Sequence, residues 1–135
     1  MAVAGWIVDK SAASRVGEPG VRLELDGLAG RLFVCPVGEL ERRYSARSAE
    51  EYDTVADELR ATFPRAEAPG DVLERALGLQ RDLAHHHGMW HRIPIPDLLI
   101  AETALHNGLG VVHVDRDFER IAEVRPLVVR RLRTG

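Results

Sequence analysis

The sequence predicts an α/β domain with a central, mostly parallel sheet flanked by helices. Three short segments, residues 6–8, 32–35 and 111–114, are almost continuously apolar, which is typical of parallel strands covered on both faces. Segments with helical spacing lie between them, and strands that alternate with helices indicate parallel strands joined by helical crossovers. The length of 135 residues suits one domain, so we expect residues 1–135 to form a single domain.

The first part of the chain is expected to contain a strand, two helices and a second strand, over residues 6–8, 10–15, 18–26 and 32–35. Pro19 suits the first turn of the second helix, because proline has no amide hydrogen to leave unpaired there. For the same reason Pro36 opens a third helix, which carries Glu39 and Glu41. Two helices therefore separate the first two strands.

The middle of the chain is expected to be helical over residues 48–62, 71–84 and 97–106. Ser48 and Glu51 have the spacing of a capping box, which begins the first of these helices. Asp71 can cap the second, whose apolar residues recur at intervals of three and four. Pro94 and Pro96 predict an extended approach to the third.

The last part is expected to contain a strand, a short helix and an edge strand, over residues 111–114, 116–123 and 128–132. Gly108 and Gly110 mark the end of the preceding helix. Since the carboxyl ends of parallel strands meet at one edge of a sheet, we expect the functional site at that edge.

Composition excludes several classes of protein. A lone cysteine, Cys35, cannot form an internal disulfide, and no apolar run approaches the ~20 residues of a membrane span. Residues 1–8 contain no basic residue, so we expect no signal peptide, no membrane association and a cytoplasmic location. The net charge of −3 by itself disfavours nucleic-acid binding, although 17 of the 18 basic residues are arginines, which can bind phosphate through two hydrogen bonds.

Five acidic residues are expected at the carboxyl edge of the sheet: Asp9, Glu39, Asp97, Asp115 and Asp117. Converging carboxylates repel one another unless a cation lies between them, and hard oxygen ligands suit Mg²⁺ or Mn²⁺. Such ions serve phosphodiester hydrolysis, where they activate water and neutralise charge at phosphorus. Taken singly, the aspartates also suit helix caps, so spacing alone leaves both interpretations open. Without these five acids the net charge of −3 becomes +2, so the net charge no longer argues against nucleic-acid binding.

Four segments resemble the motifs of PIN-domain ribonucleases, in the order that family shows. Residues 6–12, WIVDKSA, resemble its opening strand and first aspartate, and residues 96–101, PDLLIA, its third acidic motif. Residues 114–121, VDRDFERI, resemble its last acidic motif, and residues 38–41, GELE, lie where its glutamate is expected. Among PIN proteins, a single domain of this size most resembles the VapC toxins of toxin–antitoxin pairs.

The resemblance implies a metal-dependent endoribonuclease in which the five acids hold Mg²⁺ or Mn²⁺ and Ser11 supports a ligand. It also implies an RNA substrate, a VapB-type antitoxin that inserts a basic side chain among the acids, and a homodimer. We expect Arg92 and Arg116 to contact RNA phosphates. Glu41 is a rival to Glu39, since residues two apart on a helix face different ways.

Two departures from the family pattern are Lys10 and His113, which stand where many members have a hydroxyl residue.

The sequence also allows other interpretations of the function and of single residues. A PIN-like module that binds RNA or protein without cleaving is the main one. A phosphatase that uses an aspartyl intermediate is disfavoured, because Ser11 stands where it needs a second aspartate. The histidines at 85–87 and 91 suit a solvated helix end better than a metal site, and Trp90 suits a buried position. An apolar stripe along the middle helices suits either the core or an interface: Leu40, Tyr44, Tyr52, Val55, Leu59 and Phe63.

Overall fold

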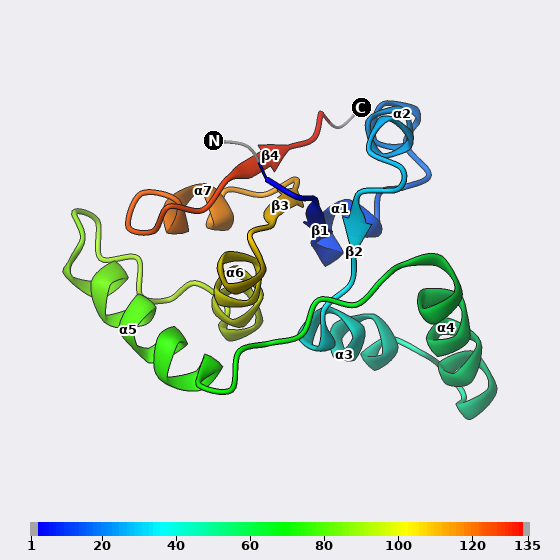
Figure 1. The fold of residues 1–135 in the computed structure, drawn as a ribbon, viewed down its shortest axis with the longest axis horizontal. Coiled ribbons are helices and arrows are strands. Elements are labelled where there is room, and N and C mark those ends of the chain that lie inside the picture. Colours follow the sequence, from blue (N-terminus) through cyan, green and yellow to red (C-terminus); the bar gives the residue numbers. More distant parts are fainter. Residues whose placement is uncertain (1–2, 134–135) are drawn as a thin grey trace.

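A computed structural model describes residues 3–133 and shows a sheet of four strands, all of them parallel (Figure 1). In spatial order the strands are β2 (Leu32–Phe33), β1 (Trp6–Val8), β3 (Gly110–His113) and β4 (Val129–Arg131). Trp6 pairs in register with Leu32 on one side and with Gly110 on the other. The predicted fold class is confirmed, and the last strand lies at the sheet's edge as expected.

Seven helices connect these strands within the described residues: α1 (Lys10–Ala13), α2 (Pro19–Gly27), α3 (Pro36–Tyr44), α4 (Ala49–Thr62), α5 (Val72–His85), α6 (Ile95–Asn107) and α7 (Asp117–Ile121). In Figure 1, α5 and α6 lie on one side of the sheet and α2 on the other, while α3 and α4 form a pair that extends away from it. No helix of the described residues has both the length and the apolar character that crossing a bilayer requires.

The core lies on both faces of the sheet, because successive strand residues point in opposite directions. Ile7 and Val111 pack in a cluster with α5, α6 and α7, where Phe118 is fully buried. Their neighbours Trp6 and Val112 pack in a second cluster with α1 and α2. With both faces covered, the carboxyl edge of the sheet is left for a site.

Three element boundaries differ from the prediction for local reasons. The second strand ends at Phe33, since Val34 pairs instead with Arg65 and Cys35 caps α3. The helix expected from residue 97 begins at Ile95, since proline is tolerated in the first turn and Pro96 occupies that turn. Helix α7 is shorter than the predicted 116–123. At its other end α6 stops at Gly108, which adopts the left-handed conformation (φ 67°) that favours glycine.

The apolar stripe of the middle helices divides between core and surface. Leu59 is buried, whereas Leu40 and Tyr44 are 66% and 87% exposed. These two residues of α3 therefore do not belong to the core of the chain.

Candidate metal centre

Four aspartates gather at the carboxyl edge of the sheet. Asp9 directly follows β1, Asp115 and Asp117 follow β3, and Asp97 lies in the first turn of α6. One carboxylate oxygen each of Asp97, Asp115 and Asp117 lies within 4.8 Å of the other two. Asp9 and Asp97 are buried, while Asp115 and Asp117 are partly exposed. Two buried and two partly exposed carboxylates therefore lie together at this edge, and we call this acidic group the acidic pocket.

Burial and mutual repulsion raise the pKa of two of these carboxyl groups. Burial raises the pKa of Asp97 to about 8, and the charges of Asp9, Asp115 and Asp117 contribute to that rise. Burial and the charge of Asp115 also raise the pKa of Asp117. Several carboxylates thus share a space in which they cannot all ionise without a compensating cation.

Ser11 connects two sides of the pocket. Its hydroxyl donates to Asp9 Oδ2 at 2.6 Å, and its backbone N–H donates to the same oxygen at 3.1 Å. The Ser11 hydroxyl in turn accepts from the backbone N–H of Val114 at 3.2 Å, just before Asp115. Ser11 therefore orients Asp9 and ties the end of β1 to the loop after β3.

Glu39, the glutamate preferred from the sequence, lies away from the four aspartates. Its side chain is buried in ion pairs with Arg43 at 2.8 Å and Arg65 at 3.5 Å. Glu41 points the other way, because two residues on an α-helix are separated by about 200°. Burial and the charge of Asp9 raise the pKa of Glu41, and Glu41 contributes to the raised pKa of Asp97. The geometry therefore favours Glu41 over Glu39 as the glutamate of the pocket.

The two arginines predicted to contact phosphate are exposed and lie near the acids. Neither Arg92 nor Arg116 forms an ion pair with another described residue. The charge of Arg116 offsets part of the rise that burial causes in the pKa of Asp117, and Arg92 lines a groove that also contains Asp117 and Arg120. Sequence reasoning missed Arg120, although its position three residues after Asp117 on a helix is a usable signal.

A divalent cation fits the pocket. Within residues 3–133, Asp9, Glu41, Asp97, Asp115 and Asp117 form no ion pair with a basic side chain. The buried Oε1 of Glu41 also has no hydrogen-bond partner among the described residues. Oxygen-only ligands of this kind are those that Mg²⁺ and Mn²⁺ prefer.

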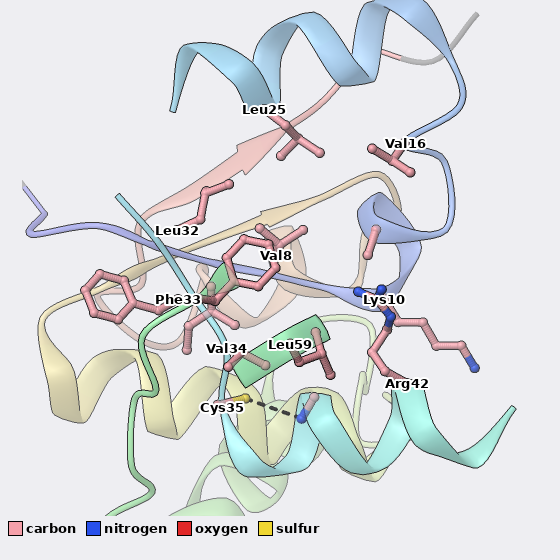
Figure 2. A pocket seen from close by; sticks show the side chains of 14 residues that line it. Val8, Lys10, Val16, Leu25, Leu32, Phe33, Val34, Cys35, Arg42 and Leu59 are labelled. Atoms are coloured by element: carbon pink, nitrogen blue, oxygen red, sulfur yellow. Dashed lines mark hydrogen bonds between the residues drawn. The ribbon is translucent and has the colours of Figure 1, made fainter. Parts of the chain in front are cut away.

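A second concavity, of about 150 Å³, lies beside the pocket between β1, β2, α1, α2, α3 and α4 (Figure 2). Its walls are mostly apolar, with Leu25, Phe33 and Leu59 among them, and Lys10 and Arg42 are its basic lining residues. Cys35 also lines it, and burial raises the pKa of this thiol to about 11. The thiol is therefore protonated at neutral pH and is no nucleophile.

The histidine-rich segment lies at a helix end, as the sequence predicts. Helix α5 stops at His85, and Gly88 takes a positive φ of 104° that breaks helical continuity. His86 interacts with Glu123 at 3.2 Å, and the exposed His85 and His87 contribute to no metal-ligand group among the described residues.

Comparison with known proteins gives matches along most of the chain. The sequence profile of the PIN domain matches residues 7–124. Ribonuclease VapC17 of Mycobacterium tuberculosis is 54% identical over 124 residues, which cover 90% of each chain. Ribonuclease VapC21 of the same organism is 40% identical over 121 residues, which cover 88% of this chain and 87% of the relative.

Solved structures show the same fold at low sequence identity. A chain of VapBC2 from Rickettsia felis, bound to a promoter DNA fragment, has a TM-score of 0.74 at 16% identity, covering 95% of this chain and 98% of that one. A chain of VapBC-5 from Mycobacterium tuberculosis has a TM-score of 0.65 at 21% identity, with the same coverage of 95% and 98%.

Proposed function

This chain belongs to the PIN-domain family, and on that premise we propose that it is an endoribonuclease, the toxin of a VapBC-type toxin–antitoxin pair. It hydrolyses RNA phosphodiester bonds with the help of Mg²⁺ or Mn²⁺ in its acidic pocket. The observation that carries the proposal is the meeting of Asp97, Asp115 and Asp117 within 4.8 Å, at the edge where Asp9 and Glu41 also point. The family match over residues 7–124 supports one PIN domain within residues 1–135.

Asp9, Glu41, Asp97, Asp115 and Asp117 would hold one or two divalent ions, and Ser11 would keep Asp9 oriented through its 2.6 Å hydrogen bond. When bound, such ions lower the pKa of water and neutralise charge that develops on the phosphate. This places Glu41, rather than the Glu39 expected from the sequence, among the ligands. Glu39 instead stabilises α3 through its two arginines.

The RNA strand would be positioned by arginines at the rim of the pocket. Arg92 and Arg116 are exposed and unpaired within the described chain, so their guanidinium groups can donate to phosphate oxygens. Attack of water in line with the leaving oxygen gives a 5′-phosphate and a 3′-hydroxyl. No protein nucleophile is required, which agrees with the protonated state of Cys35 and with the Ser11 hydroxyl donating to Asp9.

The antitoxin would cover the pocket and the concavity beside it. A basic side chain of the antitoxin would neutralise the carboxylates, and apolar side chains would fill the space between Leu25, Phe33 and Leu59 (Figure 2). For the homodimer, the exposed Leu77 of α5 and Ile95 of α6 line one apolar groove that a second copy can bury. The protein would act in the cytoplasm.

An RNA-cleavage assay tests the function and the site together. Purified protein, free of antitoxin, is incubated with total RNA and Mg²⁺ or Mn²⁺, with and without chelator. We expect cleavage that needs the metal and falls at least about 100-fold in Asp9→Asn and Asp97→Asn. Asp53→Asn, which changes an exposed aspartate of α4, is the matched control and keeps full activity.

Two results would contradict the proposal. Metal-dependent cleavage that survives both substitutions would refute the assignment of the site. No cleavage of any RNA with either metal would favour a module that binds RNA or protein without cutting it.

A further inference from the structure

Arg120 lies beside the acidic pocket without a carboxylate partner of its own. It is a residue of α7, three positions after Asp117, and it lines one groove together with Asp117. Among the described residues it forms no ion pair, whereas Arg125 and Arg131 near it in sequence pair with Asp82 and Glu119. The charge of Arg120 is therefore available to a ligand of this groove.

Trp90 is the residue that holds Arg120 in place. The guanidinium carbon of Arg120 lies over the Trp90 ring, 5.2 Å from its centroid. A guanidinium stacked on an aromatic face keeps its N–H donors in its own plane, where they remain free to bind another group. The contact thus fixes the position of Arg120 without using its hydrogen-bonding capacity.

The turn before Trp90 is shaped to hold this ring. The backbone N–H of Trp90 donates to Leu83 at 2.9 Å, and the His86 ring packs on the indole with centroids 5.0 Å apart. Gly88 has a φ of 104°, and a Cβ added there would lie 2.8 Å from the indole Nε1. Glycine is therefore needed at this position both for the backbone and for the ring.

Trp90, Arg92, Asp117 and Arg120 line one groove at the rim of the pocket. Two cations thus face a space that also touches Asp117, one of the proposed metal ligands. We propose that this groove binds the RNA phosphate next to the scissile one, with Arg120 contacting that phosphate directly and Trp90 acting as its positioning residue. This inference rests on the proposed ribonuclease function.

RNA binding tests the inference separately from cleavage. In an Asp9→Asn background with Mg²⁺, the Kd for a short fluorescein-labelled single-stranded RNA is measured by anisotropy at several salt concentrations. We expect Arg120→Ala to raise the Kd about tenfold, the loss of one charge-assisted hydrogen-bonded contact. The slope of the logarithm of the binding constant against the logarithm of the salt concentration should become less steep by about 0.7, as for one lost phosphate contact on a single strand. Arg22→Ala, at an exposed arginine of α2, is the matched control and should change neither value.

Variants of Trp90 separate positioning from a structural role. Trp90→Leu should raise the Kd and lower the salt slope as Arg120→Ala does, and the double variant should bind no more weakly than Arg120→Ala alone. Trp90→Phe keeps an aromatic face and should restore the Kd to within about threefold of the parent protein. A general loss of folding would lower binding in every Trp90 variant and would add to the effect of Arg120→Ala.

Each contrary outcome has a distinct meaning. If the native protein cleaves RNA but Arg120→Ala binds RNA as Arg22→Ala does, the inference is wrong and the proposed function stands. If Trp90→Leu weakens binding and Arg120→Ala does not, the indole contacts RNA itself and the role of Arg120 is refuted. If Arg120→Ala weakens binding only of a purified antitoxin, the groove accepts an acidic protein side chain instead. If the native protein neither binds nor cleaves RNA, the proposed function itself fails.

Discussion

Asp97→Asn should make the metal-free protein more stable, even though Asp97 is one of the proposed metal ligands. Asp97 is only 7% exposed; this burial, with the nearby charges of Asp9, Asp115 and Asp117, raises its pKa to about 8. In the unfolded chain an aspartate has a pKa of about 4. Between these two values the folded state binds one more proton than the unfolded state, so stability falls as the pH rises from about 4 to about 8.

The size of the effect follows from the same values. Between the two pKa values, each rise of one pH unit lowers the unfolding free energy by up to about 1.4 kcal/mol. Because the titration of Asp97 is coupled to that of Asp9, Asp115 and Asp117, we expect the unfolding free energy to fall by roughly half of that value per pH unit. Between pH 5 and pH 8 the stability of the native protein should fall relative to Asp97→Asn by about 2 kcal/mol.

Urea denaturation in chelator at pH 5, 6, 7 and 8 measures this difference. Asp53→Asn again serves as the control, since its exposed carboxylate should leave the pH dependence of the native protein unchanged. Adding Mn²⁺ to about 100 times its Kd should then stabilise the native protein by about 2.7 kcal/mol and leave Asp97→Asn almost unaffected. Parallel stability curves for the native protein and Asp97→Asn would refute the reasoning, as would a native protein that gains stability relative to the variant at pH 8.

Three further predictions concern the pocket and the core. Glu41→Gln should lower RNA cleavage at least about 100-fold. Glu39→Gln should keep most of the activity and lower the unfolding free energy by about 1–3 kcal/mol, because it disrupts a buried ion pair. Cleavage kinetics and urea titration of both variants test this, and the reverse pattern would make Glu39 the ligand. Ser11→Ala should lower kcat about tenfold with a small change in stability, because Asp9 loses a 2.6 Å hydrogen bond, and unchanged cleavage kinetics would show that the backbone N–H alone orients Asp9. Leu83→Ala should lower the unfolding free energy by about 2–5 kcal/mol, because Leu83 of α5 is fully buried in the larger core cluster. A loss below about 1 kcal/mol in urea titration would mean that the neighbouring side chains fill the cavity.

Much of the fold was predictable because its signals are local. Ser48 does cap α4, with its hydroxyl accepting from the backbone N–H of Glu51 at 3.0 Å. The Glu51 carboxylate accepts from the backbone N–H of Arg47 at 3.2 Å instead of that of Ser48, so only half of the capping box forms. Asp9 caps α1 in the same way, which shows that capping and a place in the pocket are compatible roles for one aspartate. Of the extended approach expected at residues 94–96, only Pro94 is extended (ψ 137°) and precedes α6; Pro96 lies in the first turn of α6, where proline is tolerated.

The membership of the PIN-domain family was predictable from four short motifs taken in order, and the family match confirms it. Which glutamate points into the pocket was not predictable from a local pattern. Glu39 and Glu41 are equally compatible with α3, and only the tertiary structure shows that Glu39 pairs with Arg65, a residue 26 positions away in the chain. Arg120 was missed for a similar reason, because its position is set by Trp90, which precedes it by 30 residues.

The sequence alone thus determined which residue types follow each strand: buried apolar segments predict parallel strands, and acids at their ends predict a cation site. Only the tertiary structure decided which of these acids share a space. Asp97, Asp115 and Asp117 meet within 4.8 Å because β3 pairs with β1 and α6 packs on that pair. The strength of an electrostatic interaction depends on distance and burial, and neither quantity is encoded by position along the chain.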